Sequence, residues 1–315
     1  MSGMRFAAIA LIVFTSIGAP ASAQTPLQTA ELVKRGLGPA DFPRVTKLAD
    51  NVYAYEEVHV GGEITTNNLI VVTPEGVLVA DGQGTPEKTA RLVAEIAKLT
   101  PQPIRYVVVA SEHGDHTGGN ASFPKNATFI SSPYSQMNLQ RAAERPARGG
   151  GPSQVVVPTE TVADKRVLKL GGTEIQILML GRSHTGGDLV VYLPAQKILF
   201  MSETYLHRMF PSLASGYPSE WVAAIKKAQA MDVNEYVPGH GFVDSPAILK
   251  AELDTYRRAL EAIIAEGKRL HDAGVPEKDA ETQARFGEFD AWSIRDMMAP
   301  RAIARVYAEL DGQLK

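Results

Sequence analysis

The chain has 315 residues, of which 44% are hydrophobic and 21% charged, as expected for a soluble globular protein with one large domain or two ordinary ones. Its net charge of −3 offers no basic surface for nucleic acid or anionic lipid, so we expect no nucleic-acid partner. Because the sequence contains no cysteine, disulfides and thiolate ligands are excluded, and any metal site must use imidazole and carboxylate groups.

The N-terminus has the pattern of a secretory signal peptide. Arg5 precedes an apolar run over residues 6–17, and Ala21-Ser22-Ala23 supplies the small residues of a cleavage site. The apolar run is shorter than the roughly 20 residues needed to cross a bilayer. We predict cleavage after Ala23, a periplasmic or secreted protein, and no membrane insertion after cleavage; an uncleaved anchor is the alternative.

The remaining chain shows strand and helix patterns in clusters. Residues 24–44 are predicted to form an N-terminal arm with a short helix or no regular structure. Strands are predicted over Val45–Val60 (one or two strands), Asn68–Thr73, Gly76–Ala80, Ile104–Ala110, Ala127–Ser131, Val155–Pro158, Arg166–Leu170, Thr173–Leu180, Leu189–Leu193, Ile198–Met201 and Tyr236–Pro238. Helices are predicted over residues 85–100, 133–143 and 218–231, and through most of the chain beyond Ala247.

This order fits neither a regular alternation of strand and helix nor an all-strand sandwich. Strand clusters separated by helices predict two sheets with helices packed outside them, an α/β sandwich over residues 45–245. Residues 246–315 form a C-terminal helical extension that could pack on the sandwich or form a homodimer contact.

Four of the seven histidines follow apolar, strand-like runs directly and lie in glycine-rich or aspartate-containing turns. Strand ends at one edge of a sheet can converge in space, and α/β ligand sites commonly lie there. The sequence therefore predicts a metal site, with Asp115 as a further member of the same cluster of turns. The four histidines are His113, His116, His184 and His240.

These turns resemble the motifs of the metallo-β-lactamase superfamily. The motif His-x-His-x-Asp-His is matched by Ser111–His116, and the Gly-x-x-His-Thr-x-Gly-Asp turn by Gly181–Asp188. The segment that carries a bridging aspartate is matched by Leu199–Glu203, and Pro-Gly-His-Gly by Pro238–Gly241. The resemblance covers roughly residues 45–245 and implies an αββα sandwich with metals at one edge of the sheets.

The resemblance also implies a chemistry. One or two zinc ions would be held by His113, Asp115, His116, His184, Glu203 and His240. A metal-bound hydroxide would attack a carbonyl of a small-molecule substrate (a β-lactam, lactone, ester or thioester), with Asp115 orienting the water or shuttling a proton. Thr185 and Asp188 could fix the ring of His184, although ordinary turn capping explains them equally well.

Two positions depart from the family pattern. Ser111 replaces the first histidine, and a serine hydroxyl is a poor zinc ligand, so we expect it to bond a metal-held water. Glu112 should face away from His113, because alternate side chains of an extended segment share a face, and it could replace the missing ligand only if the loop bends. Glu203 replaces the aspartate and reaches further, so we expect one metal to take His113, His184 and Glu203. The other would take Asp115, His116 and His240, either alone or with Glu203 as a shared ligand.

Two other functions remain open from the sequence. Iron in place of zinc would make the chain an oxidoreductase resembling the sulfur dioxygenases, and Ser111 also allows a degenerate, non-catalytic metal-binding protein. Near the expected site, His207 could bind substrate and His59 could line a cleft. Phe210, Tyr217 and Trp221 could form an apolar wall for the substrate, although core packing explains them as well.

Overall fold

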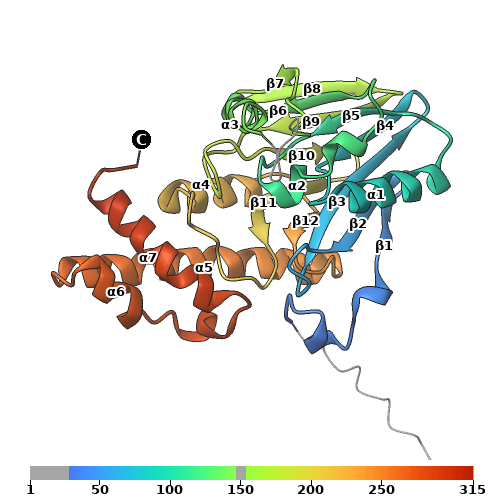
Figure 1. Ribbon diagram of the computed structural model, residues 1–315. Helices are drawn as coiled ribbons and strands as arrows, with labels where there is room; N and C mark the ends of the chain where they lie inside the picture. Colours follow the sequence, from blue (N-terminus) through green and yellow to red (C-terminus); the bar gives the residue numbers. More distant parts are fainter. Residues whose placement is uncertain (1–27, 147–153, 315) are drawn as a thin grey trace, which may run out of the picture.

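The structure is a computed structural model that describes residues 28–146 and 154–314 (Figure 1). The predicted signal peptide and its cleavage site lie outside the described residues. Within the described ranges, no helix is both long and apolar enough to span a membrane.

The elements follow the predicted order. The strands are β1 (Arg44–Ala49), β2 (Val52–Val58), β3 (Thr65–Thr73), β4 (Gly76–Ala80), β5 (Ile104–Val108), β6 (Thr128–Ser131), β7 (Glu160–Thr161), β8 (Lys165–Leu170), β9 (Thr173–Leu178), β10 (Val190–Leu193), β11 (Ile198–Leu206) and β12 (Glu235–His240). The α-helices are α1 (Pro86–Leu99), α2 (Gly114–Thr117), α3 (Pro133–Ala143), α4 (Pro218–Gln229), α5 (Pro246–Asp272), α6 (Glu277–Gln283) and α7 (Arg295–Leu310).

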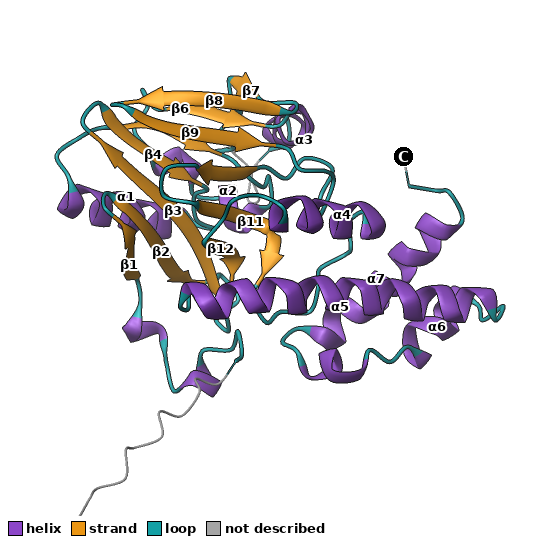
Figure 2. Cartoon of the chain, turned by 180° about the vertical axis from the view of Figure 1, so that it is seen from behind, coloured by secondary structure: helices purple, strands orange, loops and turns teal. Residues whose placement is uncertain are grey.

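The strands form a mixed, folded sheet with the order β7-β6-β5-β4-β3-β12-β11-β10-β9-β8, and β2 and β1 continue from β3. Its two halves meet where His240 of β12 pairs with Thr66 of β3. The predicted αββα sandwich is therefore confirmed, with the refinement that its two sheets are continuous at this edge. Figure 2 shows the halves as two layers with helices outside them.

Alternation along β4 shows how the layers are built. Leu78 and Ala80 belong to the large core between the halves, whereas Val77 and Val79 belong to a second core beneath α1 and α3. Successive side chains of a strand point to opposite faces, so one short apolar strand serves both cores. This burial on both faces explains the nearly continuous apolar runs of the central strands.

Two local predictions are corrected. Residues 155–158 are not a strand; the short strand β7 follows at Glu160–Thr161. Strand β11 runs past Met201 to Leu206, because its polar residues 202–204 are buried and continue the pairing with β12. The described part of the N-terminal arm is anchored, since Leu32 is buried and Arg35 forms an ion pair with Asp244 at 2.7 Å.

The C-terminal region is helical, as predicted, and packs on the sandwich. Helix α5 contacts β11 and β12, and α7 packs on α5 and α6 (Figure 2). Just before α7, Ser293 pairs with Met209, the residue that follows β11 closely. Its carbonyl also accepts a hydrogen bond from Phe210 N at 3.0 Å. The extension thus reaches the edge of the sheet at which β11 ends.

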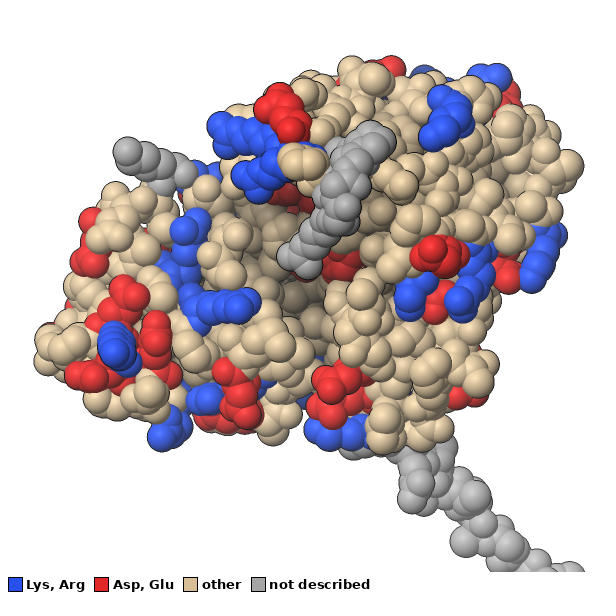
Figure 3. Space-filling model, in the orientation of Figure 1, with Lys and Arg blue, Asp and Glu red and all other residues tan. Residues whose placement is uncertain are grey.

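On the face shown in Figure 3, small groups of Lys and Arg side chains lie among groups of Asp and Glu side chains, and neither sign covers the whole face. This mixture of charges agrees with the small net charge of the chain.

Candidate metal centre

Four segments that are distant in sequence bring imidazole and carboxylate groups together at one edge of the sheet. His113 precedes the short helix α2, which carries Asp115 and His116. His184 lies in the turn between β9 and β10, Glu203 lies within β11, and His240 is the last residue of β12. The six residues expected to be metal ligands therefore lie in one place.

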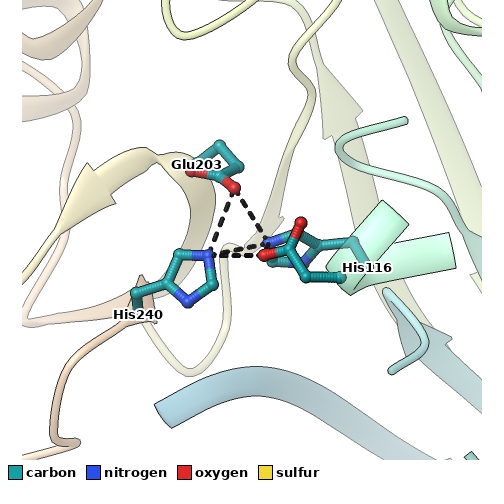
Figure 4. Close-up of side chains that lie close together, drawn as sticks. His116, Glu203 and His240 are labelled. Atoms are coloured by element: carbon teal, nitrogen blue, oxygen red, sulfur yellow. Dashed lines mark hydrogen bonds and ion pairs between the residues drawn. The ribbon is translucent and has the colours of Figure 1, made fainter. Parts of the chain in front are cut away.

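Asp115, His116, Glu203 and His240 form the first group. Figure 4 shows the last three of these side chains facing one another. The Nε2 atoms of His116 and His240 are 3.1 Å apart. Glu203 Oε1 lies 3.1 Å from the first of these nitrogens and 3.2 Å from the second. Asp115 Oδ2 lies 3.0 Å from His240 Nε2. Four potential ligand atoms thus point at one small volume.

His113, His184 and Glu203 form the second group. His113 Nδ1 and His184 Nε2 are 2.9 Å apart, and Glu203 Oε2 lies 3.6 Å from His184 Nε2. Each oxygen of the Glu203 carboxylate therefore faces a different group. Within each group the potential ligand atoms all lie within 4.8 Å of one another.

The contacts behind the rings direct one nitrogen of each imidazole into the cluster. His240 Nδ1 donates to the carbonyl oxygen of Thr65 at 2.7 Å, so Nε2 is the nitrogen that faces the cluster. His116 Nδ1 lies 3.1 Å from Asp81 Oδ2, so its Nε2 faces the cluster as well. Two imidazole nitrogens 3.1 Å apart need a proton or a cation between them, and this donor set therefore fits a cation.

The electrostatics of the cluster keep its carboxylates ionised. Burial acts to raise the pKa of Glu203, but the charges of His184 and His240 hold it well below its usual range. Burial also acts to raise the pKa of Asp115. The charge of His116 and the hydrogen bond from His240 outweigh this effect, so the pKa of Asp115 lies below its usual value. Burial lowers the pKa of His240, yet the Glu203 carboxylate raises it to about 9.

Asp81 is a candidate functional residue that the sequence did not predict. It follows β4 directly and is fully buried. Besides facing His116, its carboxylate accepts hydrogen bonds from Ser202 Oγ at 2.5 Å and from Ala110 N at 2.7 Å. Its position in the sequence could have pointed to it, because Asp81 follows one apolar strand and His113 follows the next apolar strand along the chain.

Ser111 and Glu112 belong to neither group. Ser111 is fully buried, and its hydroxyl oxygen accepts a weak hydrogen bond from His113 N at 3.5 Å. The Glu112 carboxylate accepts hydrogen bonds from Ser135 Oγ at 2.8 Å and Asn138 Nδ2 at 2.9 Å. Glu112 is therefore directed at α3 rather than toward the imidazoles.

Thr185 and Asp188 close the turn that carries His184. Asp188 accepts hydrogen bonds from Thr185 N at 2.6 Å and Ser183 Oγ at 2.8 Å, and Thr185 Oγ1 donates to it at 2.8 Å. Among the described residues, neither side chain bonds the ring of His184, whose buried Nδ1 has no hydrogen-bond partner there. Thr185 and Asp188 therefore influence the position of the His184 ring only through the backbone of the turn, which their hydrogen bonds hold in place.

A cavity of about 410 Å³ opens beside the two groups. His59 lines it, with Nδ1 at 3.0 Å from Thr66 Oγ1 and 3.7 Å from Asp115 Oδ2. His207 does not line it: this side chain is fully buried, and its Nδ1 donates to Phe242 O at 2.8 Å. Phe210, Tyr217 and Trp221 are core residues and likewise do not line the cavity.

Comparison with known proteins identifies the family. The model of the metallo-beta-lactamase superfamily matches residues 61–240. The chain belongs to this superfamily. The match begins between β2 and β3 and ends at His240, so it spans all six candidate ligands and leaves out the C-terminal helices.

Individual relatives agree with this assignment. A metallo-beta-lactamase type 2 from Bacillus sp. (strain 170) is 24% identical over 67% of this chain and 80% of its own length. A linear primary-alkylsulfatase from Pseudomonas sp. (strain ATCC 19151) is 22% identical over 55% of this chain and 40% of its own length. The chain is thus a metallo-hydrolase of the metallo-beta-lactamase superfamily.

The fold has a counterpart among solved structures. A metallo-beta-lactamase from Pontibacter korlensis superposes with a TM-score of 0.58 and 24% sequence identity, over 70% of this chain and 99% of that one. At this identity the likeness speaks for the fold alone. The family uses divalent metal ions, typically zinc, and the two groups around Glu203 are the places in this chain with the matching chemistry.

Proposed function

We propose that this protein is an exported, zinc-dependent hydrolase that cleaves a carbonyl compound: a β-lactam, lactone, ester or thioester. The observation that carries the proposal is the position of Glu203, whose two carboxylate oxygens face two separate sets of imidazoles. Imidazole nitrogen and carboxylate oxygen are ordinary zinc ligands. One ion would be held by Asp115, His116, His240 and Glu203, and the other by His113, His184 and Glu203.

The protein's own residues would orient the reaction. When bound, zinc lowers the pKa of a coordinated water to about 7 and polarises a carbonyl oxygen. Asp115 is the carboxylate of the first group that is partly open to the cavity, with a side chain 19% exposed. It can therefore hold the attacking water and pass its proton toward the leaving group. Asp81 and Thr65 hold the rings of His116 and His240 from behind.

Iron is the second candidate, and one observation favours it. The group of His113, His184 and Glu203 contains two imidazoles and one carboxylate, the donor set of non-haem iron oxygenases. Elemental analysis of protein purified without added metal decides between the two metals. Zinc with hydrolysis supports the main proposal, whereas iron with oxygen consumption supports an oxidoreductase. A non-catalytic binding protein would retain metal and turn over no substrate.

A matched pair of variants tests the main proposal. His240→Ala should lose metal and hydrolysis of nitrocefin, a lactone, or an ester and thioester panel. His271→Ala is the control, because His271 lies in α5 and bonds Asp311 at 3.0 Å, in the helical extension. Equal activity of wild-type and His240→Ala protein, or activity that survives complete removal of metal, would contradict the proposal.

Export and assembly need separate tests. N-terminal sequencing of protein from the periplasm or medium should find a chain that starts at Gln24, directly after Ala23. A cytoplasmic protein that keeps Met1 would contradict export. Sedimentation of the purified protein would test the proposed homodimer.

A further inference from the structure

The cavity beside the candidate metal centre has two chemically different walls. One is formed by the imidazoles and carboxylates described above, together with His59. The rest of the lining is mainly aliphatic, with Glu63 and Ser212 as its polar members, and its aliphatic part combines three distant chain segments. The aliphatic residues are Ile64 from the loop before β3, Leu206 and Met209 from the end of β11 and beyond, and Ile294, Met297 and Met298 from the start of α7.

The structure holds this aliphatic wall in place. Ser293 is paired with Met209, as described above, and Ser212 Oγ lies 3.3 Å from the sulfur of Met298. On the other side, Arg295 Nε donates to Asp290 Oδ1 at 2.9 Å. The start of α7 thus contacts both the segment after β11 and the turn that precedes α7. These contacts give the wall a defined position relative to Glu203, which lies in β11.

Ile294 gives a second, independent sign that this wall is functional. Its φ is 60°, in the left-handed region, where a β-branched side chain is strained. Glycine or asparagine would be the residue of choice at such a position. Strained backbone persists where the surroundings over-determine it, often beside functional sites. Here the strained residue places an aliphatic side chain in the cavity.

We propose that this wall binds an aliphatic chain of the substrate and so selects substrates that carry one next to the scissile carbonyl. The inference rests on the proposed function for the reaction itself. The cavity volume of about 410 Å³ lies within the range of roughly 300–1,000 Å³ of small-molecule sites. Met297 is 58% exposed, and flexible methionines at an open rim adapt to chains of different shape.

The test separates binding from hydrolysis. The variants are Met297→Ser and Met298→Ser, and Met137→Ser is the matched control because Met137 is 41% exposed on α3 and does not line the cavity. Fluorescence of N-phenyl-1-naphthylamine, with 1-octanol as competitor, measures apolar binding without any reaction. The kcat/KM for p-nitrophenyl octanoate and p-nitrophenyl acetate measures chain selection with a common leaving group.

The proposal predicts that each wall variant weakens octanol binding and lowers kcat/KM for octanoate by about tenfold, the effect of losing roughly two buried methylenes. The kcat/KM of the wall variants for p-nitrophenyl acetate should change less than about twofold, and so should octanol binding and kcat/KM of the Met137→Ser protein.

Wild-type octanol binding in both wall variants, or equal losses of kcat/KM for the two esters, overturns the proposal. A dimer that excludes the fluorescent probe and that dissociates in the Met297→Ser variant also overturns the proposal. In that case a second copy of the chain, rather than a substrate chain, would cover the wall. Absence of ester hydrolysis with methionine-dependent octanol binding contradicts the proposed reaction and leaves the binding wall supported.

Discussion

Asp81 Oδ2 lies 3.1 Å from Nδ1 of His116, and neither side chain is exposed to solvent. The carboxylate is itself fixed by Ser202 Oγ and by the amide of Ala110. The ends of β4 and β5 and the middle of β11 therefore fix the carboxylate that faces Nδ1 of His116, while Nε2 of the same ring faces Glu203. Groups that orient a metal-binding imidazole from behind contribute to metal affinity without touching the metal.

Asp81→Asn should lower zinc affinity about 10- to 100-fold, because the amide no longer holds the ring with a charged acceptor. Competition with a zinc chelator gives the affinity, and circular dichroism verifies the fold. Asp164→Asn, in an exposed position before β8, is the control and should bind zinc as the wild type does. An unchanged affinity in a folded Asp81→Asn protein would show that the ring is held by other contacts.

Ser111 and Glu203 should be energetically coupled. Ser111→His adds an imidazole next to the second group and should tighten binding of the second ion, whereas Glu203→Asp shortens the shared carboxylate and should weaken it. If Glu203 compensates for the absent histidine, Glu203→Asp will cost less in the Ser111→His background. We expect a coupling of about 0.5–3 kcal/mol, from zinc titrations of the four proteins in a double-mutant cycle. Strictly additive effects would mean that the two departures are unrelated.

Gly119 should not tolerate alanine, whereas Gly114 should. A Cβ at Gly119 would lie 2.1 Å from Thr89 Oγ1 and 2.2 Å from Thr85 O, although its φ of −99° suits any residue. Gly119→Ala is therefore expected to cost about 1–3 kcal/mol of stability, as overpacking does. Gly114 has nothing within 4 Å of the added atom, so Gly114→Ala should be nearly neutral. Urea denaturation measures both, and equal midpoints would contradict the packing argument.

Glu235 should make stability depend on pH. Burial raises its pKa to about 7, from an unfolded value near 4.5. The folded state thus binds this proton more tightly, so stability from this group is greatest below pH 4.5 and falls as the pH rises toward 7. Glu235→Gln removes the charge and should stabilise the protein at pH 8 by about 1 kcal/mol, after allowance for partial solvation, and have little effect at pH 4.5.

Thermal unfolding at the two pH values checks the Glu235 prediction. Glu75→Gln is the control, since Glu75 is exposed in the turn between β3 and β4. A stabilisation of Glu235→Gln that is the same at pH 4.5 and pH 8 would count against titration of this carboxyl.

Local patterns were enough to predict most elements and the turns that carry the histidines. The run Tyr106–Ala110 and the polar turn after it identify a buried strand that ends in potential metal ligands, because burial and turn formation depend on neighbouring residues. The resemblance to the family rested on the same turns and is confirmed. The prediction of β11 stopped short at Met201, since Ser202 and Glu203 look like loop residues until their burial is known.

The partners across the fold could not be obtained in this way. Periodicity tells which face of a strand is buried but not which distant segment lies against it, so the pairing of Asp81 with His116 was not predicted. For the same reason, the sequence suggested the aromatic residues after Glu203 as an apolar wall, but these residues fill the core. The cavity is lined instead by Ile294, Met297 and Met298. Those three residues reach the site because α5 packs on the sheet and α7 packs on α5, which is a consequence of long-range packing.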